Sequence, residues 1–107
     1  MSHPLPDRDA AELEPGTLGE TDIMVDNDSV RIMRNTVEPG KCTGWHQHDD
    51  DYVAILITPA VLRTELGDGT VKERTITPGL QKNSAVTHNV TNVGDVVHIG
   101  YEIEFKR

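Results

Sequence analysis

The chain has 107 residues, of which 36% are hydrophobic, and its eighteen acidic and ten basic residues give a formal net charge of −8. This length allows one domain with a single core. The acidic balance, without a cluster of lysine and arginine, argues against nucleic acid and anionic membranes as partners. The single cysteine, Cys42, excludes an intramolecular disulfide, and no apolar leader precedes the domain, so we expect a cytoplasmic protein.

Residues 1–21 are expected to form a polar arm. The stretch contains Pro4, Pro6 and Pro15 among acidic residues, and it has too little apolar surface to fold by itself. The folded domain is therefore expected to occupy residues 22–107.

From residue 22 onward, β-rich segments alternate with turn residues. Strands are expected at residues 30–37, 52–58, 61–66, 70–76, 86–92 and 96–105. The glycines at 67 and 69 predict a hairpin, and the continuous apolar run at 52–58 is typical of a strand buried on both faces. With no amphipathic helix in the pattern, the fold class is all-β, an antiparallel sandwich or barrel.

The last expected strand has an apolar face and a polar face, because its residues alternate. His98, Glu102 and Glu104 lie on the polar face. We expect His98 to face solvent or a neighbouring strand rather than to bind a metal. The sequence identifies no inward-facing Asp or Glu that would serve as a general base.

Three histidines form the candidate site. His46 and His48 are two residues apart on an extended segment, so their side chains point to the same face. His88, from a distant strand, can meet them, and three neutral imidazoles make a transition-metal site with open positions. We predict one divalent metal on these histidines. Imidazole ligands accept Fe, Ni, Mn and Zn, so the sequence leaves the metal's identity open.

The spacing of these residues resembles two motifs of the cupin family, carried here by Gly40-x5-His46-x-His48-x3-Tyr52 and by His88-x3-Asn92. The resemblance covers residues 30–105 and points to the small single-domain bacterial cupins. It implies an antiparallel jelly-roll β-barrel, usually dimeric, with one divalent metal inside.

Position 52 departs from the cupin pattern. The first cupin motif usually has a glutamate there, as the fourth metal ligand, whereas this chain has Tyr52. If Tyr52 faces inward, Asp51 faces outward, so Asp51 is not assigned as a ligand. The phenol of Tyr52 can bind the metal, donate a hydrogen bond to a metal-bound water or simply pack, and we favour the second role. Asn92 is expected in a turn or behind the ligands.

Arg34 is the candidate substrate-binding residue. It shares a face with Ile32 and Thr36, and from a pocket wall it would hold a substrate carboxylate.

Three functions remain open. The first is an enzyme, a non-haem metal-dependent oxygenase or isomerase that uses the three-histidine metal for dioxygenase-type or Lewis-acid chemistry on a small polar molecule. The alternative is a non-catalytic barrel that binds a metal and a small ligand, and the third is a structural remnant whose histidines bind metal adventitiously. In each case a small barrel with unpaired edge strands gains by pairing with a copy of itself, so we predict a homodimer.

Overall fold

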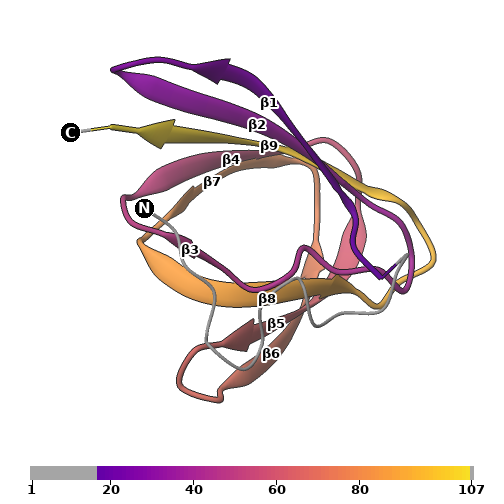
Figure 1. The fold of residues 1–107 in the computed structure, drawn as a ribbon. Helices are drawn as coiled ribbons and strands as arrows, with labels where there is room; N and C mark the ends of the chain where they lie inside the picture. The colour runs from indigo at the N-terminus through magenta and orange to yellow at the C-terminus, as the bar shows by residue number, and fades with distance from the viewer. Residues whose placement is uncertain (1–16, 107) are drawn as a thin grey trace.

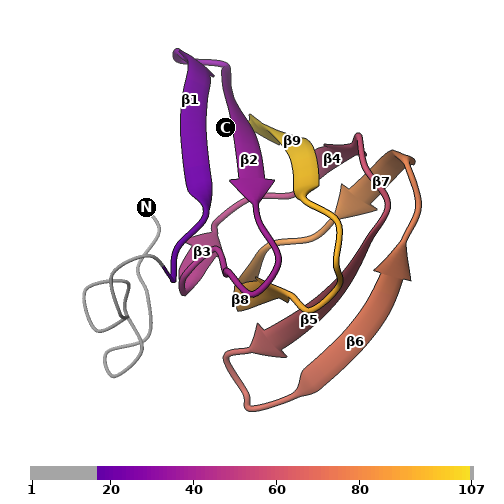
Figure 2. The same ribbon diagram turned by 90° about the vertical axis from the view of Figure 1, so that its right-hand side faces the viewer.

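The computed structural model describes residues 17–106 as two antiparallel β-sheets that enclose a common interior, with no helix in that range (Figures 1 and 2). The strands are β1 (Glu20–Asp26), β2 (Val30–Val37), β3 (His46–His48), β4 (Tyr52–Leu56), β5 (Ala60–Leu66), β6 (Val71–Ile76), β7 (Gly79–Asn83), β8 (Val86–Asn92) and β9 (His98–Phe105). The five-stranded sheet has the order β1-β2-β9-β4-β7, and the four-stranded sheet has the order β3-β8-β5-β6. The predicted all-β jelly roll is confirmed.

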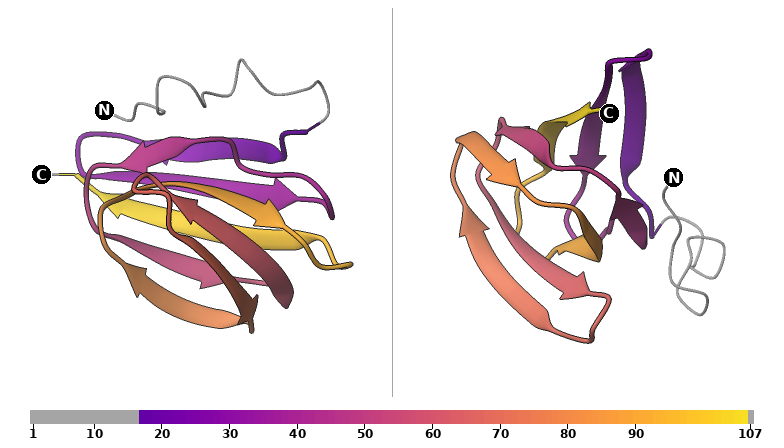
Figure 3. Two further views of the ribbon diagram at one scale, coloured as in Figure 1. Left: turned by 90° about the horizontal axis from the view of Figure 1, so that it is seen from below. Right: turned by 90° about the vertical axis from the view of Figure 1, so that its left-hand side faces the viewer.

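The chain crosses repeatedly from one sheet to the other. Among the strands of residues 17–106, only β1–β2 and β5–β6 are hairpins between consecutive strands, and every other connection changes sheet (Figure 3). In the predicted β5–β6 hairpin, Gly69 has a φ of 91°, which suits glycine, and the Leu66 N–H donates to the Thr70 carbonyl over 2.8 Å. Neighbouring strands are therefore distant in sequence, and side chains from both halves of the chain meet inside.

The strands at 30–37 and 86–92 have the predicted bounds, but β7 was not predicted. The one large apolar residue of β7, Leu80, is 73% exposed, so the segment lacks the usual signal of a buried face. The prediction that the run beginning at Tyr52 is buried on both faces is wrong. Alternate residues of β4 are buried, whereas Val53 and Ile55 are only half-buried on the outer surface, as in a sheet with one face on the core.

The polar face of β9 turns inward. His98 is 8% exposed, and the side chains of Glu102 and Glu104 are each 17% exposed, whereas Phe105 on the alternate face is 50% exposed. Of the two places expected for His98, solvent or a neighbouring strand, solvent is therefore wrong. The interior of this barrel is polar along β9, and this places two carboxylates inside.

The boundary expected after residue 21 falls within β1, which begins at Glu20. Just before it, the Gly19 N–H donates to the Cys42 carbonyl, and the Cys42 N–H donates to the Thr17 carbonyl, both over 2.9 Å. The remainder of the expected arm, residues 1–16, lies outside the described residues. Within residues 17–106, no helix has the length and apolar character needed to cross a membrane.

Candidate metal centre

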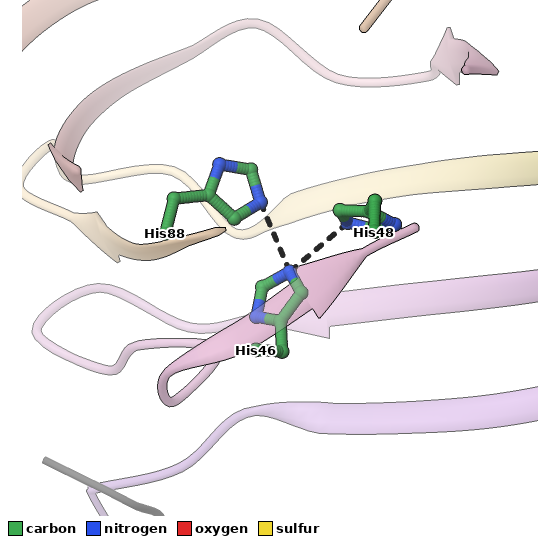
Figure 4. Close-up of side chains that lie close together, drawn as sticks. All are labelled: His46, His48 and His88. Atoms are coloured by element: carbon green, nitrogen blue, oxygen red, sulfur yellow. Dashed lines mark hydrogen bonds between the residues drawn. The ribbon is translucent and has the colours of Figure 1, made fainter. Parts of the chain in front are cut away.

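The three predicted histidines come together on one wall of the interior. The short strand β3 carries His46 and His48 and pairs antiparallel with β8, where His88 lies directly opposite His46. The Nε2 atom of His46 is 3.1 Å from that of His48 and 3.0 Å from that of His88. Figure 4 marks these two contacts with dashed lines. One ligand nitrogen from each ring lies within 4.8 Å of the other two.

These separations fit a shared metal ion. Two nitrogens bound at right angles to a metal at about 2.1 Å lie roughly 3.0 Å apart, close to both Nε2 separations from His46. The sheet register sets this arrangement, because β3 and β8 place the facing positions at the distance of a strand pair.

The outer nitrogens of two rings are held by acceptors. The Nδ1 atom of His46 lies 2.8 Å from the Gly44 carbonyl, and that of His48 lies 2.5 Å from Oε2 of Glu104. Because a carbonyl or carboxylate oxygen only accepts, each Nδ1 carries a proton, and a ring in its neutral form then presents an Nε2 lone pair inward. Two lone pairs 3.1 Å apart repel unless a proton or a metal cation lies between them. The donor set therefore fits a metal.

Burial keeps two of the rings neutral at pH 7. It lowers the pKa of His46 to about 4, against the opposing effect of the Gly44 carbonyl, and with the neighbouring His46 it lowers the pKa of His88 to about 3. A metal binds neutral imidazole, so protons compete weakly with it at these two rings at neutral pH.

Tyr52 stacks on a ligand ring. Its ring centroid is 4.1 Å from that of His48, with 24° between the planes. Burial, with Glu102 and Glu104 adding to it, raises the pKa of Tyr52, so the phenol keeps its proton at neutral pH. The stacking packs Tyr52 against the back of the site and restrains His48. The hydrogen bond from Tyr52 to a metal-bound water stays a prediction.

The sequence analysis missed two carboxylates of the site. Besides the contact of Glu104 with His48, Glu102 places Oε2 3.8 Å from Nε2 of His48, and its Oε1 accepts a hydrogen bond from Asn35 over 3.0 Å. Burial raises the pKa of Glu102, although His48 acts in the opposite direction. The alternation of β9 was the available signal, but alternation does not say which face is inside.

A cavity of about 730 Å³ adjoins the histidines. Its lining includes the apolar side chains of Ala54, Leu56, Leu62, Leu66, Ile76, Val86 and Val90, together with Gln81 and Asn83. Arg34 lies on the opposite face of β2 and does not line the cavity. The basic residues that line it are Arg31, Lys72 and Arg74, and Arg31 is paired directly with Glu104.

The remaining candidates occupy other places. Asp51 is exposed and accepts a hydrogen bond from the Ala85 N–H over 3.3 Å, which agrees with its not being assigned as a ligand. His98 lines the cavity but is not part of the three-histidine group. Asn92, expected in a turn or behind the ligands, is the last residue of β8; it is fully buried and bonds backbone groups of the turn that follows.

No protein-family model and no curated protein matches the sequence. Among solved structures, the chain is similar to a cupin domain from Bordetella pertussis Tohama I, with 32% identity, a TM-score of 0.77, and coverage of 84% of this chain and 95% of that one. An RmlC-like cupin from Methanocaldococcus jannaschii has a TM-score of 0.67 at 12% identity, covering 89% and 87%. A cupin-2 domain containing protein from Shewanella frigidimarina has a TM-score of 0.53 at 19% identity, covering 81% and 80%.

Proposed function

The chain belongs to the cupin family, and from this premise we propose that it holds one divalent transition metal on His46, His48 and His88 and uses it on a small polar molecule. Bound there, the metal would supply Lewis-acid or dioxygen chemistry. The observation that carries the proposal is that the Nε2 atoms of the three histidines converge. In two of the rings, His46 and His48, the Nδ1 atom on the other side is bonded to an acceptor.

The basic residues around the cavity support a polar, anionic substrate, whereas the carboxylates of Glu102 and Glu104 lie at the His48 end of the cavity. Arg31, Lys72 and Arg74 line its walls and would attract a carboxylate or another anionic group. In this proposal they take the substrate-binding role expected of Arg34.

The proposal is tested by elemental analysis of the purified protein after incubation with Fe, Ni, Mn or Zn ions. We expect about one metal ion per chain, lost in the variant His46→Ala/His88→Ala, because each substitution removes one of the three donors. The control is His98→Ala, which changes a histidine of the same cavity outside the three-histidine group and should leave the metal content unchanged.

Failure of the wild type to take up any of these ions would refute the proposal, as would equal metal content in the double variant. For a metal-loaded protein, oxygen consumption with candidate carboxylates separates oxygenase chemistry from Lewis-acid chemistry. Tight retention of a small ligand without turnover would instead support the non-catalytic alternative.

We further propose a homodimer formed through the outer face of the five-stranded sheet. Ile55, Tyr101 and Leu80 lie side by side across β4, β9 and β7, and Leu80 is 73% exposed. Such an apolar stripe on a sheet face is typical of a protein–protein contact. Among residues 17–106, β1 is an edge strand of this sheet, and its open edge adds to the stripe. A cytoplasmic location also stays a proposal, supported by a lone buried cysteine.

We expect light scattering to give the mass of a dimer at micromolar concentration and the mass of a monomer for Leu80→Asp. Burying the new carboxylate in the contact would cost several kcal/mol. The matched control is Val71→Asp, which places the same charge at a residue 56% exposed on the other sheet and should leave the dimer intact. A monomeric wild type would contradict the proposal.

A further inference from the structure

Three histidines leave part of a metal's coordination shell to other groups, and Glu102 on β9 lies beside one of them, His48. Its Oε2 lies 3.8 Å from Nε2 of His48, the nitrogen that faces the other two rings. We infer that Glu102 is a fourth protein ligand of the metal, bound through Oε2. This inference rests on the proposed metal binding and extends it to a residue outside the histidine group.

The separation is suited to a shared metal rather than to a direct bond. At 3.8 Å, Oε2 of Glu102 and Nε2 of His48 are too far apart for a hydrogen bond. Two donor atoms that each bond one metal at about 2.1 Å lie up to roughly 4.2 Å apart, and closer together when the donor–metal–donor angle is below 180°. The observed distance falls within this span.

A chain of hydrogen bonds orients the carboxylate. Oε1 of Glu102 accepts from Nδ2 of Asn35 over 3.0 Å, and Oδ1 of Asn35 accepts from the hydroxyl of Thr21 over 2.8 Å. This chain crosses β1, β2 and β9, and it holds Glu102 so that Oε2 faces His48. Outer hydrogen bonds of this kind orient metal ligands in proteins.

Glu104 has a different task. Its Oε2 contacts Nδ1 of His48, on the side of the ring away from the other histidines, so it positions a ligand and does not bind the metal. The two carboxylates alternate with Ile103 along β9 and therefore lie on the same face. Three neutral imidazoles bring no negative charge to the site. One carboxylate ligand would offset part of the charge of a divalent cation.

The test uses Co²⁺ as the probe, with calorimetry for affinity and infrared difference spectra for carboxylate ligation. We expect Glu102→Gln to weaken Co²⁺ binding at least about 10-fold and to abolish the carboxylate band shift that Co²⁺ causes in the wild type. Glu104→Gln is the matched control, two residues away on the same face. It should also weaken binding, because His48 loses its orienting acceptor, but it should keep the band shift.

The outcomes separate the inference from the proposed function. If the wild type binds no Co²⁺ and none of the other four metals, the proposed function fails, and the inference fails with it. If the wild type binds Co²⁺ and Glu102→Gln keeps its affinity and band shift, the inference alone is overturned. Should Glu102→Gln not fold, Glu104→Gln still decides, because a band shift that persists there supports Glu102 and one that vanishes overturns it.

Discussion

Lowering the pH from 7 to 5 is expected to destabilise the metal-free protein by about 4 kcal/mol through two buried histidines. In the folded chain burial holds the pKa of His46 at about 4 and that of His88 at about 3, whereas an unfolded histidine titrates near 6.5. At a pH between the folded and unfolded pKa values, these histidines are protonated in the unfolded state but not in the folded state. The free energy of unfolding therefore decreases as the pH is lowered, by up to about 1.4 kcal/mol per pH unit for each histidine.

Urea unfolding at pH 7, 6 and 5 in the presence of a chelator measures this loss. The comparison is with His46→Gln/His88→Gln, which keeps polar side chains at both positions but removes the titrating groups, and whose stability should depend much less on pH. Glu102, whose pKa burial raises, acts in the opposite direction as the pH falls. The difference between the two proteins therefore isolates the histidines, and equal losses in both would contradict the prediction.

The histidines of the site were predictable because their signal is local. Side chains two positions apart on a strand lie on the same face, independently of the rest of the fold. His46 and His48 therefore had to point the same way. The strand that carries His88 was likewise marked by its own composition and by the turns around it. Its pairing with His46 supplies the third donor.

The carboxylates and the basic residues of the cavity were not predictable from alternation alone. Alternation separates Arg31 from Arg34, and Glu104 from Phe105, but it does not say which set is inside. In the fold, Tyr52 is buried and lies opposite Glu104, which in turn lies opposite Arg31, so all three share the inner face. This register joins strands that are far apart in sequence, and only the assembled sheet determines it.

The Asn92→Ala variant is expected to lose about 3–4 kcal/mol of unfolding free energy, since each buried polar group left unpaired costs about 1–3 kcal/mol. Asn92 is 0% exposed, and its Nδ2 donates to the carbonyls of Val37 and Val96 over 2.9 and 2.7 Å. Its Oδ1 accepts from the Gly94 N–H over 3.0 Å. One side chain therefore ties the end of β2 to the loop between β8 and β9.

Asn89→Ala is the matched control, on the same strand and with a side chain that is also buried, at 6% exposure. The Asn89 side chain donates one hydrogen bond, to Glu65 over 3.1 Å, and its Oδ1 has no partner among residues 17–106. Its loss should therefore cost only about 1 kcal/mol by urea unfolding. If both variants lost the same unfolding free energy, burial of an asparagine side chain would set the loss. A threefold larger loss in Asn92→Ala would instead assign it to the three hydrogen bonds that the Asn92 side chain makes. Because β8 also carries His88, the loosened end of this strand should weaken metal binding in Asn92→Ala as well.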